Sequence, residues 1–133
     1  MTKPSKSLRS PMSTVRGLGS AKDGVHHWWL QRVTAIVLVP LTVWFMCSLM
    51  SHVVGKDLQA LKDWLGSPGV AATLLVMLTA LFYHARLGLQ VVIEDYVHCA
   101  CKKTALIIFI TILFPVLTLI TWMSILKIHF WTI

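Results

Sequence analysis

The sequence predicts an all-α integral membrane protein with three transmembrane helices, and three observations lead to this fold class. Hydrophobic residues make up 56% of the 133-residue chain and charged residues only 13%, with a mean hydropathy of +0.74. Three apolar stretches, 33–54, 69–93 and 105–126, exceed the roughly 20 residues that a helix needs to cross a bilayer. Basic residues gather before the first stretch. This composition disfavours a soluble single domain.

Residues 1–32 form a basic N-terminal arm before the first span. Its first part is interrupted by Pro4, Pro11, Gly17 and Gly19, so we expect an extended chain there until it meets a partner. No short apolar region with a cleavage site follows the first basic residues, so we expect no signal peptide. The arm also lacks an amphipathic presequence rich in Arg and Ser, which favours a bacterial inner membrane over a mitochondrial one.

The net charge of +7 is unevenly distributed along the chain. The arm has one acidic residue, Asp23, against six basic ones: Lys3, Lys6, Arg9, Arg16, Lys22 and Arg32. The loop 55–68 instead balances two Lys with two Asp. By the positive-inside rule this places the N-terminus in the cytoplasm, the 94–104 loop inside, and the 55–68 loop and the 127–133 tail outside. The same distribution argues against a nucleic-acid partner, although clustered Lys and Arg can neutralise phosphates.

The outer loop 55–68 is predicted to contain a short helix. Apolar residues recur at helical spacing in this loop, which predicts a short helix on the outer surface; they are Leu58, Leu61, Trp64 and Leu65. Ser67 and Pro68 suit the N-cap and first position of the second span.

The chain outside the three spans is too short for a second folded domain. Three helices present more surface to lipid than to one another, so any polar function must be buried against a partner, and we expect a subunit of a larger complex.

The second span carries ionisable residues at membrane depth, where polar groups are costly and mark functional candidates. His84 has Ala80 one turn before it and Gly88 one turn after it on the same helix face. Small neighbours predict a recess beside the imidazole that a porphyrin or a closely packed helix can fill. The functional interpretation makes His84 an axial ligand of haem iron. The alternative is a histidine hydrogen-bonded to a neighbouring helix.

Other polar residues near the inner side have two interpretations each. Arg32 can pair with a haem propionate or snorkel to lipid headgroups, and for Arg86 the spacing from His84 favours snorkelling. Asp95 and Tyr96 can hydrogen-bond a quinone carbonyl and link it to water, or form a solvated helix end with an interfacial tyrosine.

The remaining candidate ligands give weaker signals. Adjacent His26 and His27 cannot share one helix face, and His98 lies in a loop. Three cysteines without C-x-x-C spacing support neither a disulfide framework nor a zinc site; they are Cys47, Cys99 and Cys101.

Two segments resemble a known family. Residues 24–36 read GVHHWWLQRVTAI and residues 84–97 read HARLGLQVVIEDYV. Together with the three-span outline, they resemble the small hydrophobic membrane anchor of succinate dehydrogenase (complex II), a cytochrome b membrane subunit. The histidine, glycine and Asp-Tyr spacing is the specific part of this resemblance, which extends over nearly the whole chain.

The resemblance implies that this chain and a second three-helix anchor subunit enclose one haem b and attach the flavoprotein and iron–sulfur subunits to the membrane. Carried over by position, His84 is the axial ligand, Arg32 contacts a propionate, and His26 lies near the propionates. Tyr96 donates a hydrogen bond to ubiquinone, with Asp95 beside it. Succinate chemistry then lies in other polypeptides, and this chain alone is not a catalyst.

Alternative functions remain open at this stage. The chain can be a cofactor-free structural anchor in which His84 packs against a partner, or the anchor of a fumarate reductase. A transporter component is disfavoured because three spans without an inverted repeat offer no substrate path. Haem content separates the first alternative from the electron-transfer function.

Overall fold

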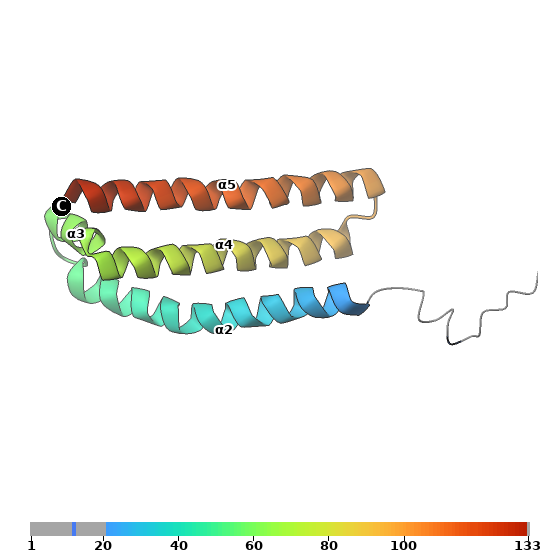
Figure 1. Cartoon of the computed structure of the whole chain (residues 1–133), viewed down its shortest axis with the longest axis horizontal. Coiled ribbons are helices and arrows are strands. Elements are labelled where there is room, and N and C mark those ends of the chain that lie inside the picture. The colour runs from blue at the N-terminus through green and yellow to red at the C-terminus, as the bar shows by residue number, and fades with distance from the viewer. Residues whose placement is uncertain (1–11, 13–20, 133) are drawn as a thin grey trace, which may run out of the picture.

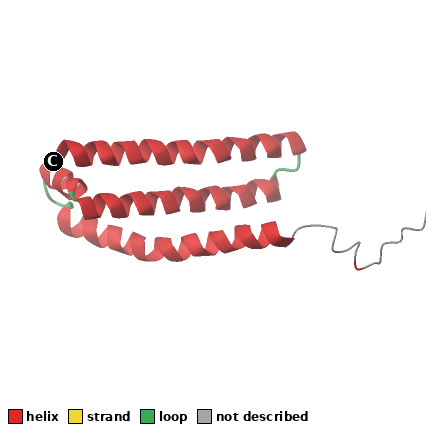
Figure 2. Ribbon diagram, in the orientation of Figure 1, coloured by secondary structure: helices red, strands yellow, loops and turns green. Residues whose placement is uncertain are grey.

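The structure, a computed structural model, describes Met12 and residues 21–132. The order of the elements is α2 (Ala21–His52), α3 (Leu58–Gly66), α4 (Pro68–Tyr96) and α5 (Ala100–Thr132). The three long helices run side by side with α4 between α2 and α5, and the short α3 closes one end (Figure 1). The described residues contain no strand (Figure 2). The predicted all-α class with three helices long and apolar enough to cross a membrane is confirmed.

Five of the six ends of the long helices lie beyond the apolar stretches that predicted them; the exception is the C-terminal end of α2, at His52 rather than residue 54. The first helix begins at Ala21 rather than residue 33, and the last reaches Thr132. A spanning helix keeps its backbone hydrogen bonds as it passes through the headgroup region, where polar side chains carry little penalty. Hydropathy therefore predicts which part of a helix lies in the hydrocarbon core of the membrane, but it does not predict where the helix begins and ends. The extended arm expected for residues 1–20 lies, apart from Met12, outside the described residues.

The short helix α3 was predicted from the loop pattern and is confirmed. Asp57 caps it, and its side chain accepts a hydrogen bond from the Ala60 backbone N–H at 3.1 Å. Gly55 has a φ of +76°, a left-handed conformation that glycine adopts without strain, and this turn directs the chain from α2 into α3. Ser67 then ends α3 and starts α4, with Pro68 in its first turn, as the sequence predicted.

The best-packed part of the molecule lies at the α3 end. Trp64 is 7% exposed and forms a cluster with Ala71, Leu74 and Ile125. Trp64 Nε1 donates to Ser48 Oγ at 2.8 Å, and a ring nitrogen of His129 lies 2.7 Å from the Gly66 carbonyl oxygen. These contacts connect all four helices. Toward the opposite end α2 and α4 share a polar cavity.

Much of the apolar surface stays exposed on the isolated chain. From residue 33 onward α2 has no single apolar stripe, and neither has α5: large apolar side chains are exposed on several faces of both helices. Such helices face lipid or other apolar helices on every side. The described bundle therefore has little core of its own apart from the α3 end, and its large apolar surface fits a membrane and a partner.

Candidate functional site

His84 lies on the side of α4 that faces α2. Its Nδ1 lies 2.9 Å from Thr34 Oγ1 and its Nε2 lies 3.4 Å from Gln31 Nε2. Thr34 in turn donates to the Leu30 carbonyl at 2.8 Å. His84 is half-buried, so its ring is held between two helices and has access to the neighbouring cavity.

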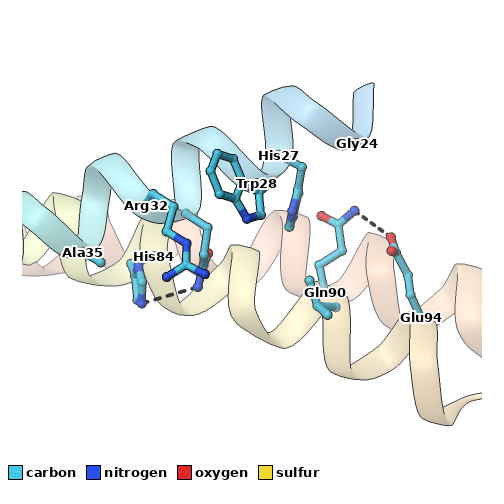
Figure 3. Close-up of a pocket in the computed structure, with 10 residues that line it drawn as sticks. Gly24, His27, Trp28, Arg32, Ala35, His84, Gln90 and Glu94 are labelled. Atoms are coloured by element: carbon cyan, nitrogen blue, oxygen red, sulfur yellow. Dashed lines mark hydrogen bonds between the residues drawn. The ribbon is translucent and has the colours of Figure 1, made fainter. Parts of the chain in front are cut away.

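A cavity of about 700 Å³ lies between α2 and α4 beside His84 (Figure 3). Its lining residues from α2 recur every three or four positions and so form one face of that helix: Gly24, His27, Trp28, Gln31, Arg32 and Ala35. Helix α4 contributes His84, Gln90, Val91 and Glu94. The volume falls within the range of cavities that hold small molecules and cofactors.

The cavity wall carries both signs of charge. The Arg32 guanidinium lies over the Trp28 ring, with its central carbon 5.6 Å from the ring centroid. On the α4 side, Gln90 Nε2 donates to Glu94 Oε1 at 2.8 Å (Figure 3). Both Trp28, at 56% exposure, and Arg32 stand at the open rim. The rim therefore presents a cation that can bind an anionic group, and a partner is needed to close it.

Two buried polar atoms on this wall have no hydrogen-bond partner within the described part of the chain. They are His27 Nε2 and Gln31 Oε1. Buried polar atoms in proteins are nearly always paired, so unpaired ones beside a cavity indicate that another molecule completes their hydrogen bonds. Sequence reasoning missed Gln31, Gln90 and Glu94. The available signal is that Gln31 lies one turn after His27 and one turn before Ala35, and that Gln90 and Glu94 lie one turn apart on α4.

The small residues near His84 do not form the recess as predicted. Neither Ala80 nor Gly88 lines the cavity. A Cβ at Gly88 would lie 3.4 Å from Gln31 Nε2, so the glycine gives room to a side chain of α2. The cavity beside His84 is instead formed between α2 and α4, by side chains of both helices.

Arg86 lies on a different face of α4 from His84, in agreement with the spacing argument. It lines a separate cavity of about 380 Å³ between α4 and α5, together with Tyr83 and Phe114 among others. Its Nε is buried without a hydrogen-bond partner among the described residues.

The other predicted site residues lie outside the cavity lining. His26 is exposed on α2, while its neighbour His27 lines the cavity. Asp95 and Tyr96 are exposed at the C-terminal end of α4, next to Glu94, and Tyr96 is 78% exposed. Lys103 Nζ donates to the Glu94 carbonyl at 2.8 Å, which holds the start of α5 against this end. Thus Arg32 and His84 share one cavity, whereas Asp95 and Tyr96 form a neighbouring exposed end.

Three helices long and apolar enough to cross a membrane, with a cavity between two of them that a histidine and an arginine line, define a small membrane protein with a candidate polar site between α2 and α4. The chain belongs to the succinate dehydrogenase/fumarate reductase transmembrane subunit family, whose model matches residues 6–127. This match confirms the family that the sequence resembled.

Named relatives cover most of the chain. It is 37% identical to a succinate dehydrogenase hydrophobic membrane anchor subunit of Rickettsia bellii, over 86% of this chain and 90% of the relative. A relative of the same name from Rickettsia conorii is 38% identical over the same shares. One from Paracoccus denitrificans is 30% identical over 74% of this chain and 75% of its own. No solved structure matches the chain.

Proposed function

We propose that this chain is the hydrophobic membrane anchor subunit of a succinate dehydrogenase and that His84 is its axial ligand to a haem b shared with a second anchor subunit. The family and the names of the relatives support the anchor role. The observation that carries the site is the half-buried imidazole of His84 beside a cavity that Arg32 also lines. A neutral imidazole is a common axial ligand of haem iron.

The residues around the cavity fit a haem. Arg32 offers a planar guanidinium at the rim, which suits a propionate carboxylate. His26 lies outside the cavity lining, and its proposed place near the propionates comes from the sequence resemblance. His27 lines the same cavity and its Nε2 has no hydrogen-bond partner among the described residues, so a propionate carboxylate would accept from this nitrogen when it carries the ring proton. Haem, when bound, supplies a one-electron redox centre. A second ligand to the iron would come from the partner anchor subunit, with which the haem would be shared.

The quinone site is assigned to the exposed end of α4. The Tyr96 hydroxyl donates a hydrogen bond to a ubiquinone carbonyl oxygen, and Asp95 links this end to water. Reduction of ubiquinone to ubiquinol takes up two electrons and two protons. The electrons come from succinate through the flavoprotein and iron–sulfur subunits, and the protons come from water at the membrane surface. An exposed phenol at the helix end suits this role, because a partner can cover it.

The assembly follows from the same proposal. The chain sits in a bacterial inner membrane with its N-terminus and the Asp95–Tyr96 end on the cytoplasmic side, as the distribution of Lys and Arg favours. The flavoprotein and iron–sulfur subunits attach on that side. Lipid covers the apolar surface that the second anchor subunit leaves exposed.

The decisive experiment uses the complex purified from its native membrane in mild detergent through a tag on this chain. The co-purifying polypeptides are identified, and a dithionite-reduced minus oxidised absorption spectrum is recorded. We expect a b-type haem signal with a flavoprotein and an iron–sulfur protein, and His84→Ala is expected to lose or perturb that signal. His129→Ala is the matched control, because His129 is also half-buried and hydrogen-bonded but lies at the α3 end. Unchanged haem in His84→Ala contradicts the ligand assignment.

A second candidate function is a cofactor-free structural anchor. Both ring nitrogens of His84 already contact α2, through Thr34 and Gln31, as in a histidine that packs helices together. The complex would then contain the partner subunits without haem. Comparing succinate oxidation with fumarate reduction in the same preparation separates the succinate dehydrogenase anchor from a fumarate reductase anchor, since the family includes both.

A further inference from the structure

The side-chain contact between Thr34 and His84 joins α2 to α4 inside the membrane-spanning region. Thr34 Oγ1 lies 2.9 Å from His84 Nδ1. The same oxygen lies 2.8 Å from the Leu30 carbonyl oxygen and 3.1 Å from that of Gln31. The Thr34 hydroxyl is therefore within hydrogen-bond distance of both a backbone carbonyl and a ring nitrogen of His84.

The direction of these hydrogen bonds follows from the groups that take part. A backbone carbonyl only accepts, and a threonine hydroxyl carries a single proton, which it donates to the Leu30 carbonyl. The hydroxyl oxygen can then accept from His84, and this arrangement corresponds to the neutral imidazole tautomer with its proton on Nδ1. The lone pair of the ring is consequently on Nε2.

The contact of Gln31 with the other ring nitrogen agrees with this assignment. Gln31 Nε2 carries two protons and no acceptor site, and it lies 3.4 Å from His84 Nε2. A lone pair on His84 Nε2 can accept from this amide nitrogen; because the opposite amide orientation would place Gln31 Oε1 there, the Gln31 contact is only compatible with the assignment, and the Thr34 contact carries it. This distance is beyond the usual range for N–H donors, so the Gln31 contact is weak and is readily given up.

We propose that Thr34 is a positioning residue for His84: it holds the ring in one orientation and in the tautomer that leaves Nε2 free to bind iron. The inference rests on the proposed role of His84 as a haem ligand. Ligating histidines in metal sites generally donate their other N–H to a fixed acceptor, which orients the ring and raises its basicity. Thr34 supplies that acceptor from the neighbouring helix, so the packing of α2 on α4 prepares the ligand.

The proposal predicts how substitutions at Thr34 change the haem. Thr34→Val keeps the shape of the side chain and removes the acceptor. We expect a higher haem midpoint potential, because a less basic imidazole stabilises ferric iron less. We also expect a shifted low-spin electron paramagnetic resonance signal and haem retention weakened by about 10- to 100-fold. Thr34→Ser keeps the hydroxyl and is expected to restore the midpoint potential, the resonance signal and the haem retention.

The test uses the intact complex, with Thr121→Val as the matched control. Thr121 is half-buried in α5 and donates to the Leu117 carbonyl at 2.7 Å, the same backbone contact as Thr34, but it lies away from His84. A Thr34→Val complex with unchanged potential, resonance signal and haem retention overturns the proposal, and so does a Thr34→Ser complex that behaves like Thr34→Val. If His84→Ala loses haem while Thr34→Val is unchanged, only this inference fails. If His84→Ala also keeps its haem unchanged, the proposed function fails.

Discussion

Trp64 on α3 donates its indole N–H to Ser48 Oγ on α2 at 2.8 Å, and this bond joins two helices at the best-packed end of the molecule. The Trp64 ring also lies 6.2 Å from the Phe45 ring, measured between centroids. The short helix thus fixes the α3 ends of the long helices, while the cavity beside His84 lies toward their other ends. The best-packed cluster and the cavity beside His84 therefore lie in different parts of the bundle.

Substitutions at the Trp64–Ser48 pair are expected to reduce stability. Ser48→Ala leaves the indole N–H without its acceptor and should cost about 1–3 kcal/mol. Trp64→Ala also opens a cavity and should cost about 3–5 kcal/mol. Denaturant titration of the purified complex, followed by circular dichroism, measures both. Ser124→Ala is the control, because Ser124 is exposed and bonds only its own helix in the described contacts; a Ser48→Ala loss no larger than that of the control contradicts the role of this bond.

Gly88 is expected to tolerate a methyl group but not a large side chain. Gly88→Ala places its Cβ 3.4 Å from the flexible Gln31 side chain, and the better helix propensity of Ala offsets the contact. Gly88→Leu should cost about 1–3 kcal/mol by forcing α2 and α4 apart. Haem content and thermal unfolding of the complex measure the effect. Gly69→Leu is the control, since nothing lies within 4 Å of a Cβ there; equal effects at both glycines would mean that α2 does not limit the space at Gly88.

Arg32 is expected to contribute to haem retention through its charge and its geometry. Arg32→Gln should weaken retention by about 10- to 100-fold, the value of a charge-assisted hydrogen bond. Arg32→Lys should recover part of this, because lysine keeps the charge but not the planar fork. Transfer of haem from the complex to an excess of apomyoglobin measures retention. Arg86→Gln is the control, because Arg86 lies on the other cavity; a loss at Arg86 as large as that at Arg32 would contradict the assignment.

Tyr96 is expected to act on quinone reduction and not on the haem. Tyr96→Phe removes one hydrogen bond to the quinone, so kcat/KM for a soluble ubiquinone analogue should fall by about tenfold. The reduced minus oxidised spectrum should stay unchanged. Tyr83→Phe is the control, because Tyr83 lies on the cavity between α4 and α5. Quinone reduction that is unaffected by Tyr96→Phe removes Tyr96 from the quinone site.

Local sequence signals predicted the elements of this fold well. Apolar length predicted the three long helices, and the spacing of Leu58, Leu61 and Trp64 predicted α3. The separation of His84 from Arg86 onto different faces of α4 also followed from helix geometry alone. These features depend on residues close together in the chain. The helix ends were less well predicted, because polar residues such as those of 21–32 continue a helix without adding to its hydropathy.

The sequence by itself determined the all-α membrane class, the three spans, the helix α3 and the candidate ligand His84. Only the tertiary structure decided which residues of α2 face that histidine, and so brought Thr34 and Gln31 to its two ring nitrogens. The physical reason is that α2 has no single apolar stripe from residue 33 onward, so its apolar pattern does not fix the rotation of the helix about its axis. That rotation and the register along α4 follow from packing between helices far apart in the sequence.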